Sequence, residues 1–384
     1  MFKIGPRTEE SKLTSWYYEI DRRLLGGVLL MIFIGMLFAL SAGSVAAERI
    51  GQPWHFFLVK AIPFYIMGFV FLFGSSFLTK KQVLFLAALN LGVGLALLPV
   101  TVVSPHMIKN SARFISFGFF NIMPSDIMKP GFVIMTAWFL AQMKQRYGES
   151  IFFNREAWRF DKLFSWVWYL LVFFIVIAII FRHPDFGTSI LYLAVFSAMI
   201  FIAGLPLSVL PFIGIGVGLL GVVAFFTLGH VQRRVISFVT GTGDTYQVDN
   251  SVDSIRHGGL LGAGDDAFVK QFLPDAHTDF IFAAIAEDLG AIMACGLLVL
   301  LFYVFRRLVK TAMNSRDLFL TYAAGGTAAL FGTQICINML STLKLFAPKG
   351  MTLPFISYGG SSLLAYCLLF GMLLALIRED KWKK

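Results

Sequence analysis

Residues 188–229 form a run of 42 residues without one charged side chain. A helix needs about 20 apolar residues to cross the hydrocarbon core of a bilayer, so this run is too long for a single crossing. Gly204-Leu205-Pro206 stands near its middle, and such a glycine and proline pair interrupts a helix. The run therefore predicts two membrane-spanning helices joined at this turn.

Eight further segments have the length and apolar character of membrane-spanning helices. They dominate the composition: 58% of the 384 residues are hydrophobic and only 14% are charged, whereas a soluble domain carries about 25% charged residues. With the two helices above the total is ten, and an even number places both ends of the chain on one side. We therefore predict an all-α, polytopic membrane protein. The eight segments are 24–45, 54–76, 83–103, 127–143, 163–181, 280–305, 318–340 and 358–377.

Lysine and arginine placement predicts the orientation, because short cytoplasmic segments carry an excess of these residues. With both ends in the cytoplasm, the inner segments hold 20 of the 32 basic residues, the outer segments hold 10, and two lie within spans. We expect a protein of the cytoplasmic membrane, with no removable signal peptide, because its first 22 residues are polar and charged. The predicted parts are a cytoplasmic tail at 1–22, one transmembrane domain at 23–378 and a second cytoplasmic tail at 379–384.

The net charge of +10 comes from basic residues in short connecting segments. This placement favours anionic headgroups or an anionic lipid-linked substrate over nucleic acid. One connection stands apart, at about 230–279, between the seventh and eighth spans on the predicted outer side. It is far longer than an ordinary connection and is rich in Gly, Asp and Arg, so we expect an ordered, functional loop.

Charged groups near the hydrocarbon mark a pathway or a site, because burying them there costs free energy. Lys129 stands at the predicted outer end of the fourth span, one turn from an aspartate that it could neutralise. Carboxylates from three separate pieces of chain reach the same outer rim in this topology. They are Asp126, Asp185 and Asp279, with Glu287 and Asp288 about two turns deeper in the eighth span.

Structural roles remain open for several of these residues. Asp126 follows a serine and Asp279 follows a threonine, and either carboxylate could cap a helix N-terminus. Lys129 could be only a counter-ion for Asp126. His277 has no second His or Cys at ligand spacing, which favours a satisfied polar residue over a metal ligand.

Three familiar catalytic patterns are incomplete in this sequence. The glycine-rich stretch 258–264 lacks the GK[ST] ending of a phosphate-binding loop. Residues 241–244 spell GxGD, but the Tyr-Asp pair that intramembrane aspartyl proteases add to it occurs nowhere in the chain. Residues 358–362 do not form a GxSxG nucleophile elbow, and their small side chains favour close helix packing.

Four motifs, in order and in register, carry a family resemblance that covers essentially the whole chain. Residues 272–282 read FLPDAHTDFIF and are followed at 286–290 by AEDLG, while residues 351–362 read MTLPFISYGGSS. PSDIMK at 124–129 and HPDFGT at 183–188 are shorter and match in the expected places. Together they closely resemble the signatures of the SEDS family, named for shape, elongation, division and sporulation.

Within the family, WYYEIDR at 16–22 and AAERIG at 46–51 resemble the division members in their alphaproteobacterial form, with the elongation members as the close alternative. Some family positions carry other residues, although every acidic position stays acidic. These departures put substrate contacts from the residues at 123 and 114 in doubt. The departing residues are Met123, Asp126, His183, Asn250 and the stretch Ala112-Arg113-Phe114, which has one arginine fewer than usual.

The resemblance implies a peptidoglycan glycosyltransferase that polymerises lipid II, an undecaprenyl-pyrophosphate-linked disaccharide peptide, outside the cytoplasmic membrane. The acceptor is a sugar hydroxyl that needs a base, and the resemblance assigns this role to Asp279. A carboxylate of ordinary pKa is ionised at pH 7. Direct displacement inverts the anomeric carbon, so no covalent nucleophile is required.

The departing pyrophosphate requires cations, and the candidates are basic side chains or a divalent ion such as Mg²⁺ or Mn²⁺ held by the carboxylates. No other cofactor is implied. Asp126 and Asp185 would orient Lys129 or line the substrate cavity. The complete set of predicted substrate contacts is Lys129, Arg113, Arg233 (or its neighbour Arg234), Asp126, Asp185, His277 and Ser361.

The resemblance also implies partners, namely a class B penicillin-binding protein with a transpeptidase domain and other division proteins at the septum. Two alternatives to the enzyme remain. A lipid II flippase would need charges along a path through both leaflets, whereas these charges gather at the outer rim. A non-catalytic division scaffold would need no such cluster at all.

Overall fold

In the residues that it describes, the computed structural model of the chain is mainly helical, with one pair of two-residue strands, β1 (Ile115–Ser116) and β2 (Asn121–Ile122). The strands pair antiparallel and lie between the third and fourth long helices along the chain. The structure describes residues 12–103, 114–116, 121–148, 151–162, 164–182, 186–227, 229–240, 246–346 and 350–382.

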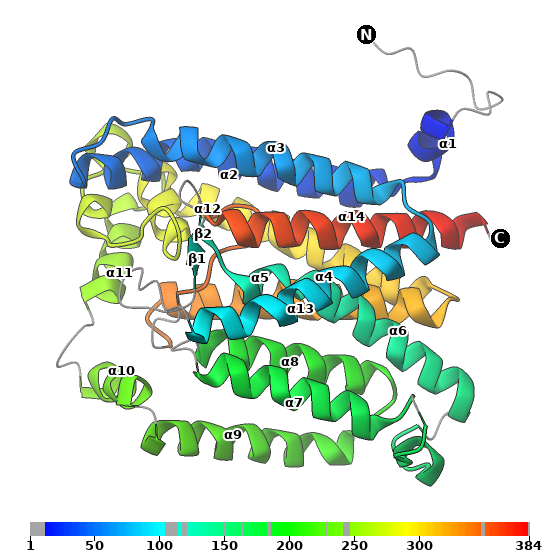
Figure 1. Cartoon of the computed structure of the whole chain (residues 1–384). Helices are drawn as coiled ribbons and strands as arrows, with labels where there is room; N and C mark the ends of the chain where they lie inside the picture. Colours follow the sequence, from blue (N-terminus) through cyan, green and yellow to red (C-terminus); the bar gives the residue numbers. More distant parts are fainter. Residues whose placement is uncertain are drawn as a thin grey trace.

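In the described residues, ten long helices occupy the ten predicted positions, which confirms the predicted all-α, polytopic fold (Figure 1). In the described part of the chain, six helices are long and apolar enough to cross a bilayer, and two shorter apolar helices, 166–180 and 187–202, accompany them. The ten are α2 (Arg22–Arg49), α3 (Phe56–Ser76), α4 (Lys80–Val103), α6 (Lys129–Tyr147), α7 (Trp166–Arg182), α8 (Phe186–Ile202), α9 (Leu210–Thr227), α12 (Ile281–Asn314), α13 (Leu318–Thr342) and α14 (Gly360–Trp382).

The long uncharged run breaks where its sequence predicts. α8 ends at Ile202, residues 203–206 form the turn, and the short 3₁₀ helix η3 (Leu207–Val209) leads into α9. α9 packs mainly against η3 and α10 (Gly229–Thr240), and none of its best apolar window is buried within the chain. The helix therefore lies at the edge of the bundle, where its apolar side chains suit a lipid environment.

Of the six helices that are long and apolar enough to cross a bilayer in the described residues, α14 is the most enclosed, with 94% of its apolar window buried. α14 packs most extensively against α3 and also contacts α4, α5 (Pro124–Ile127), α6 and α13. A helix that is apolar on all sides and enclosed by its neighbours forms the core of such a bundle. Residues at its N-terminal end are thereby held at the meeting point of several helices.

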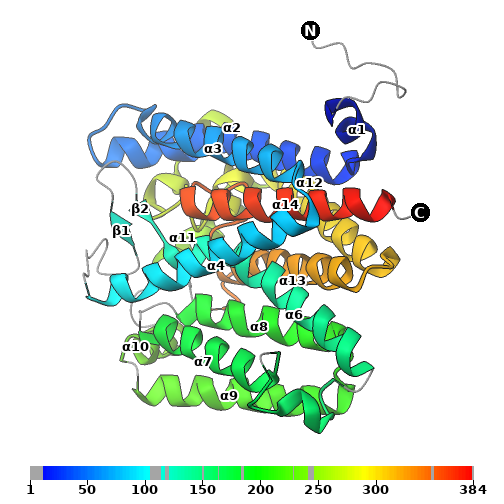
Figure 2. The same ribbon diagram turned by 45° about the vertical axis from the view of Figure 1, so that its right-hand side comes forward.

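The two ends of the bundle differ (Figures 1 and 2). α1 (Lys12–Glu19) lies at the same end as the C-terminal part of α14, and Trp16 Nε1 donates a hydrogen bond to Ser76 Oγ at 2.8 Å. The strands, α10 and α11 (Tyr246–Gly258) lie at the opposite end. The described ends of the chain therefore share one side, as an even number of spans requires, while the cytoplasmic orientation stays a prediction.

The predicted outer loop at 230–279 contains regular structure. α10 and α11 are followed by two 3₁₀ helices, η4 (Gly264–Asp266) and η5 (Val269–Phe272). α11 packs along α12 and against η5. The segment is thus folded onto the bundle directly before Asp279 and the start of α12.

Candidate active site

A cavity of about 410 Å³ opens at the end of the bundle that carries β1 and β2. Segments far apart in sequence converge on it: the start of α3, β2, α5 and α6, the residues before α12, and those before and in the first turn of α14. Its polar or charged lining residues are Lys60, Asn121, Asp126, Lys129, Thr188, Asp275, Thr278, Asp279, Gln334, Thr352, Tyr358, Ser361 and Ser362.

Asp126 and Lys129 form an ion pair at the entrance to α6, with 2.6 Å between Oδ1 and Nζ. Pro124 begins the short helix α5 and a second proline follows Lys129, and proline suits the first turn of a helix. The N-cap positions of α5 and α6 are Met123 and Met128, so Asp126 is not an N-cap residue and lies in the first turn of α5. The side chain of Lys129 is only 4% exposed, and a charge so buried needs such a partner.

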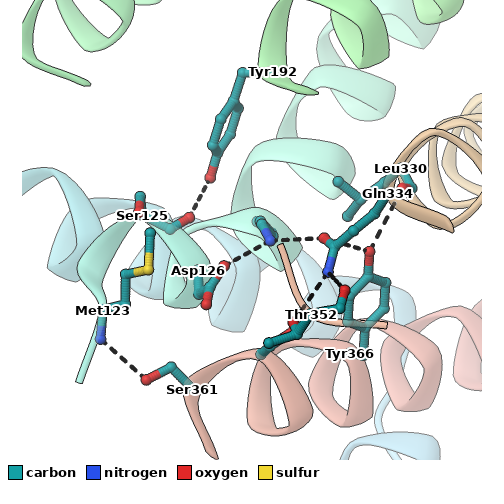
Figure 3. A network of polar contacts seen from close by, with 11 residues as sticks. Met123, Ser125, Asp126, Tyr192, Leu330, Gln334, Thr352, Ser361 and Tyr366 are labelled. Atoms are coloured by element: carbon teal, nitrogen blue, oxygen red, sulfur yellow. Dashed lines mark hydrogen bonds and ion pairs between the residues drawn. The ribbon is translucent and has the colours of Figure 1, made fainter. Parts of the chain in front are cut away.

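A hydrogen-bond network fixes the ammonium group of Lys129 from the other side (Figure 3). Lys129 Nζ donates to Gln334 Oε1 at 2.8 Å, and the hydroxyl of Tyr366 donates to the same oxygen at 2.9 Å. Gln334 Nε2 donates to the carbonyl of Thr352 at 2.8 Å. Because both ends of the amide are engaged, its orientation is determined, and its oxygen faces the lysine.

Ser361 and Ser362 bind neighbouring segments at the N-terminus of α14. The backbone N–H of Met123 donates to Ser361 Oγ at 3.0 Å, and Thr352 Oγ1 donates to Ser362 Oγ at 3.0 Å. These contacts join α14 to the residue before α5 and to the non-helical segment that precedes α14. Ser361 thus lines the cavity as predicted and also fixes its wall.

Asp279 lines the same cavity and stands two residues before the start of α12. Its backbone N–H donates to the carbonyl of Asp275 at 3.0 Å, and Asn338 Nδ2 donates to its carbonyl at 2.7 Å. The N-cap position of α12 is Phe280, so Asp279 stands one residue before the N-cap. A Cβ at Gly350 would stand 3.3 Å from Asp279 Oδ2, so backbone approaches the carboxylate closely.

The turn that carries Asp279 has an unusual backbone. Asp275 has φ 58°, a left-handed conformation that aspartate tolerates better than most residues. Its carbonyl accepts the N–H groups of Thr278 and Asp279, both at 3.0 Å. Such conformations persist only where the surroundings hold them, and they gather at functional sites.

His277 supports the wall of the cavity from behind. Its ring lies 4.5 Å from that of Phe57 and 5.5 Å from that of Tyr358, measured between centroids, and it is 8% exposed. The N–H of Tyr358 donates to its carbonyl at 2.9 Å. Phe57 and Tyr358 line the cavity, whereas His277 is one layer away.

The structure therefore brings together Asp126, Lys129, Asp279 and Ser361 of the predicted site. Arg113 and Asp185 lie outside the described residues. Arg233 and Arg234 belong to α10, and their side chains are likewise outside what the structure describes.

Several residues of the site were not predicted from the sequence. Gln334 and Asn338 stand four residues apart in an apolar span, and polar side chains there are a signal in themselves. Thr352 and Tyr366 carry no such signal, because they act through contacts between distant segments. Lys60, which the sequence places with Lys129 as the two basic residues within predicted spans, lines the cavity as an exposed cation over the ring of Phe56, at 4.2 Å from its centroid.

The residues described include no group of three His, Cys, Asp or Glu side chains that could hold a metal ion. The carboxylates of the cavity have the oxygen donors that Mg²⁺ prefers; Asp275 and Asp279 belong to one turn, and Asp126 belongs to α5. A divalent cation at this site stays a proposal.

Ten long helices with a charged cavity at one end define a class, the polytopic membrane proteins with a polar site at the mouth of a helical bundle. The chain belongs to the FtsW, RodA and SpoVE family, described as cell cycle proteins, whose family model matches residues 22–382. The resemblance to the SEDS family is thereby confirmed.

Curated relatives and solved structures agree with this assignment. The probable peptidoglycan glycosyltransferase FtsW of Caulobacter vibrioides is 34% identical over 97% of this chain and 93% of that protein. The protein of the same name from Coxiella burnetii is 31% identical over 97% of this chain and 100% of its own length. The fold is shared with a chain of a peptidoglycan synthase complex that coordinates polymerization and crosslinking (TM-score 0.74, 23% identity, 94% and 98% covered) and with Thermus thermophilus rod shape determining protein RodA (TM-score 0.64, 22% identity, 94% and 97% covered).

Proposed function

We propose that this protein is a peptidoglycan glycosyltransferase that polymerises lipid II at the outer face of the cytoplasmic membrane during cell division. One observation carries the proposal: the Asp279 carboxylate and the buried Asp126–Lys129 pair line the same cavity at one end of the bundle. The names of the full-length relatives support the activity and the division role.

Asp279 is the general base of the proposed reaction. It accepts the proton of the acceptor sugar hydroxyl while that oxygen attacks the anomeric carbon of the donor. The new glycosidic C–O bond forms as the bond to the pyrophosphate oxygen breaks, and the pyrophosphate leaves with the electron pair. The carboxylate is suited to this task because hydrogen bonds to Asp275 and Asn338 fix its backbone on both sides.

The cations of the cavity stabilise the departing pyrophosphate. Among the described residues, the basic side chains that line the cavity are Lys60 and Lys129. Asp126 and Gln334 hold the ammonium group of Lys129 in one place, so it needs no reorganisation when negative charge develops. Arg113, Arg233 and a divalent cation are further candidates, and Asp185 is proposed to orient Lys129 or line the cavity.

The partner is proposed to be a class B penicillin-binding protein, which supplies the transpeptidase, at the division septum. The fold shared with a chain of a peptidoglycan synthase complex supports this pairing. The outward-facing apolar side chains of helices such as α9 leave room in the membrane for the span of a partner.

Purified protein in vesicles that contain fluorescent lipid II tests the proposal. The wild-type protein is expected to form glycan polymer, and Asp279→Asn to reduce its rate by about 10²- to 10⁴-fold, the usual contribution of a general base. Asp266→Asn, at an exposed aspartate of η4, is the matched control and keeps the rate. Translocation of lipid II without polymer would support a flippase, and neither activity would support a scaffold.

A further inference from the structure

Glu287, two turns into α12, is a fully buried carboxylate with both oxygens engaged. Oε1 accepts the backbone N–H of Val269 at 2.7 Å and a hydrogen bond from His257 Nδ1 at 3.0 Å. Oε2 accepts the backbone N–H of Lys270 at 2.7 Å. A buried charge persists where it receives such bonds, so Glu287 has a defined structural task.

These bonds close a loop of chain that contains the proposed base. Val269 begins η5, the turn with Asp275 and Asp279 follows, and Glu287 is reached after the first two turns of α12. The side chain of Glu287 thus fastens the start of the segment to its end. The Asp279 carboxylate lies between the two fastened points.

A second pair strengthens the same attachment. Lys270 Nζ forms an ion pair with Asp288 and donates to Ser41 Oγ of α2 at 3.2 Å. Ser41 Oγ in turn donates to Asp288 Oδ2 at 2.5 Å. η5 is therefore held to two spans of the bundle through one lysine.

α12 is broken at Gly290, three residues after Glu287. Gly290 has φ 81° and ψ 172°, which no helical residue adopts and which favours glycine. The next two N–H groups leave the helix and donate to the carbonyls of Gly259 (2.9 Å) and Leu260 (3.3 Å). The AEDLG motif thus ends one helical segment at the point where the outer loop packs onto it.

We propose that Glu287 is a positioning residue for the reaction: it sets the place of Asp279 through the backbone of η5 and does not contact substrate. Glu287 is not among the residues that line the cavity. The inference rests on the proposed function, because it assumes that Asp279 is the base. Glu287 would therefore affect the chemical step and not the binding of substrate.

The test compares Glu287→Gln with wild type in kcat, KM and amide hydrogen exchange. A glutamine keeps one acceptor oxygen and presents an NH₂ group to a backbone donor, so one of the two N–H bonds is lost. We expect kcat per folded molecule to fall roughly 100-fold, the loss that follows a displacement of about 1 Å. KM is expected to change little, and exchange to become faster in residues 267–279 but not in α13 or α14.

Asp266→Asn again serves as the control, since it removes an exposed carboxylate from the same loop. His257→Ala removes only one of the three bonds to Glu287, and we expect an approximately fivefold loss of kcat together with faster exchange at 267–279. If Glu287→Gln does not fold, His257→Ala tests whether Glu287 positions Asp279.

A purely structural role would lower the melting temperature of Glu287→Gln and leave kcat per folded molecule within a factor of about two, which would overturn the inference. Unchanged amide exchange at 267–279 would overturn it as well. Amide exchange can be measured even if the wild-type protein makes no polymer. Absence of polymer from the wild-type protein would refute the proposed function instead.

Discussion

The ammonium group of Lys129 donates a hydrogen bond to Gln334 Oε1 at 2.8 Å, although the two residues are 205 positions apart in the chain. Lys129 stands at the start of α6 and Gln334 in the middle of α13, and these two helices pack against each other. The contact places a fixed positive charge in a cavity that also contains the Asp279 carboxylate. The packing of α6 against α13 thus helps to hold the positive charge of Lys129 in the cavity.

Gln334→Leu tests this contact. The substitution removes the acceptor of Lys129 and of Tyr366, so we expect a loss of about 1–3 kcal/mol in stability and a clear fall in polymerisation rate. Thermal unfolding in detergent and a lipid II assay measure the two effects. Gln52→Leu, at an exposed glutamine between α2 and α3, is the control and should change neither.

The Asp126–Lys129 pair predicts non-additive effects on stability. Lys129→Met leaves a poorly exposed carboxylate without its counter-ion, which costs about 3–5 kcal/mol when a buried pair is broken. Adding Asp126→Asn removes that charge and should recover part of the stability but none of the activity. Equal, additive losses in a double-mutant cycle would show that the pair does not interact.

The sequence predicted the ten spans because apolar length is a local property, and the turn at Pro206 is a local break within it. It also paired Lys129 with Asp126, since three residues separate them at the start of one span. Gln334, Thr352 and Tyr366 could not be assigned, because their roles depend on how distant helices pack. Neither Asp126 nor Asp279 occupies an N-cap position, because α5 begins after Met123, α6 after Met128 and α12 after Phe280.

Gly350 and Gly51 allow a matched comparison. Both have a positive φ, 64° and 66°, so alanine strains the backbone equally, by about 1–2 kcal/mol. A Cβ at Gly350 stands 3.3 Å from Asp279 Oδ2, whereas one at Gly51 meets nothing within 4 Å. We expect Gly350→Ala to lower kcat and Gly51→Ala to leave it unchanged at similar stability. Equal kcat values for Gly350→Ala and Gly51→Ala would show that the Asp279 carboxylate does not lie close to residue 350 in the active protein.

The membrane orientation is open to cysteine labelling. Asp265→Cys in η4 and Arg159→Cys in the predicted inner loop both lie at exposed positions, in a background without the three native cysteines. A membrane-impermeant maleimide should label position 265 in intact spheroplasts and position 159 only after permeabilisation. The reverse pattern would put the cavity on the cytoplasmic side.

The central claim is that the Asp279 carboxylate removes the proton of the acceptor hydroxyl. Single-turnover polymerisation by Asp279→Ala, with and without added formate, tests it most directly, because a small carboxylate can occupy the space of the missing base. We expect the polymerisation rate of Asp279→Ala to be at least about 100-fold below that of wild type and to be partly restored by formate. Formate is not expected to restore the rate of Asp126→Ala. A rate near that of wild type in Asp279→Ala without formate would contradict it.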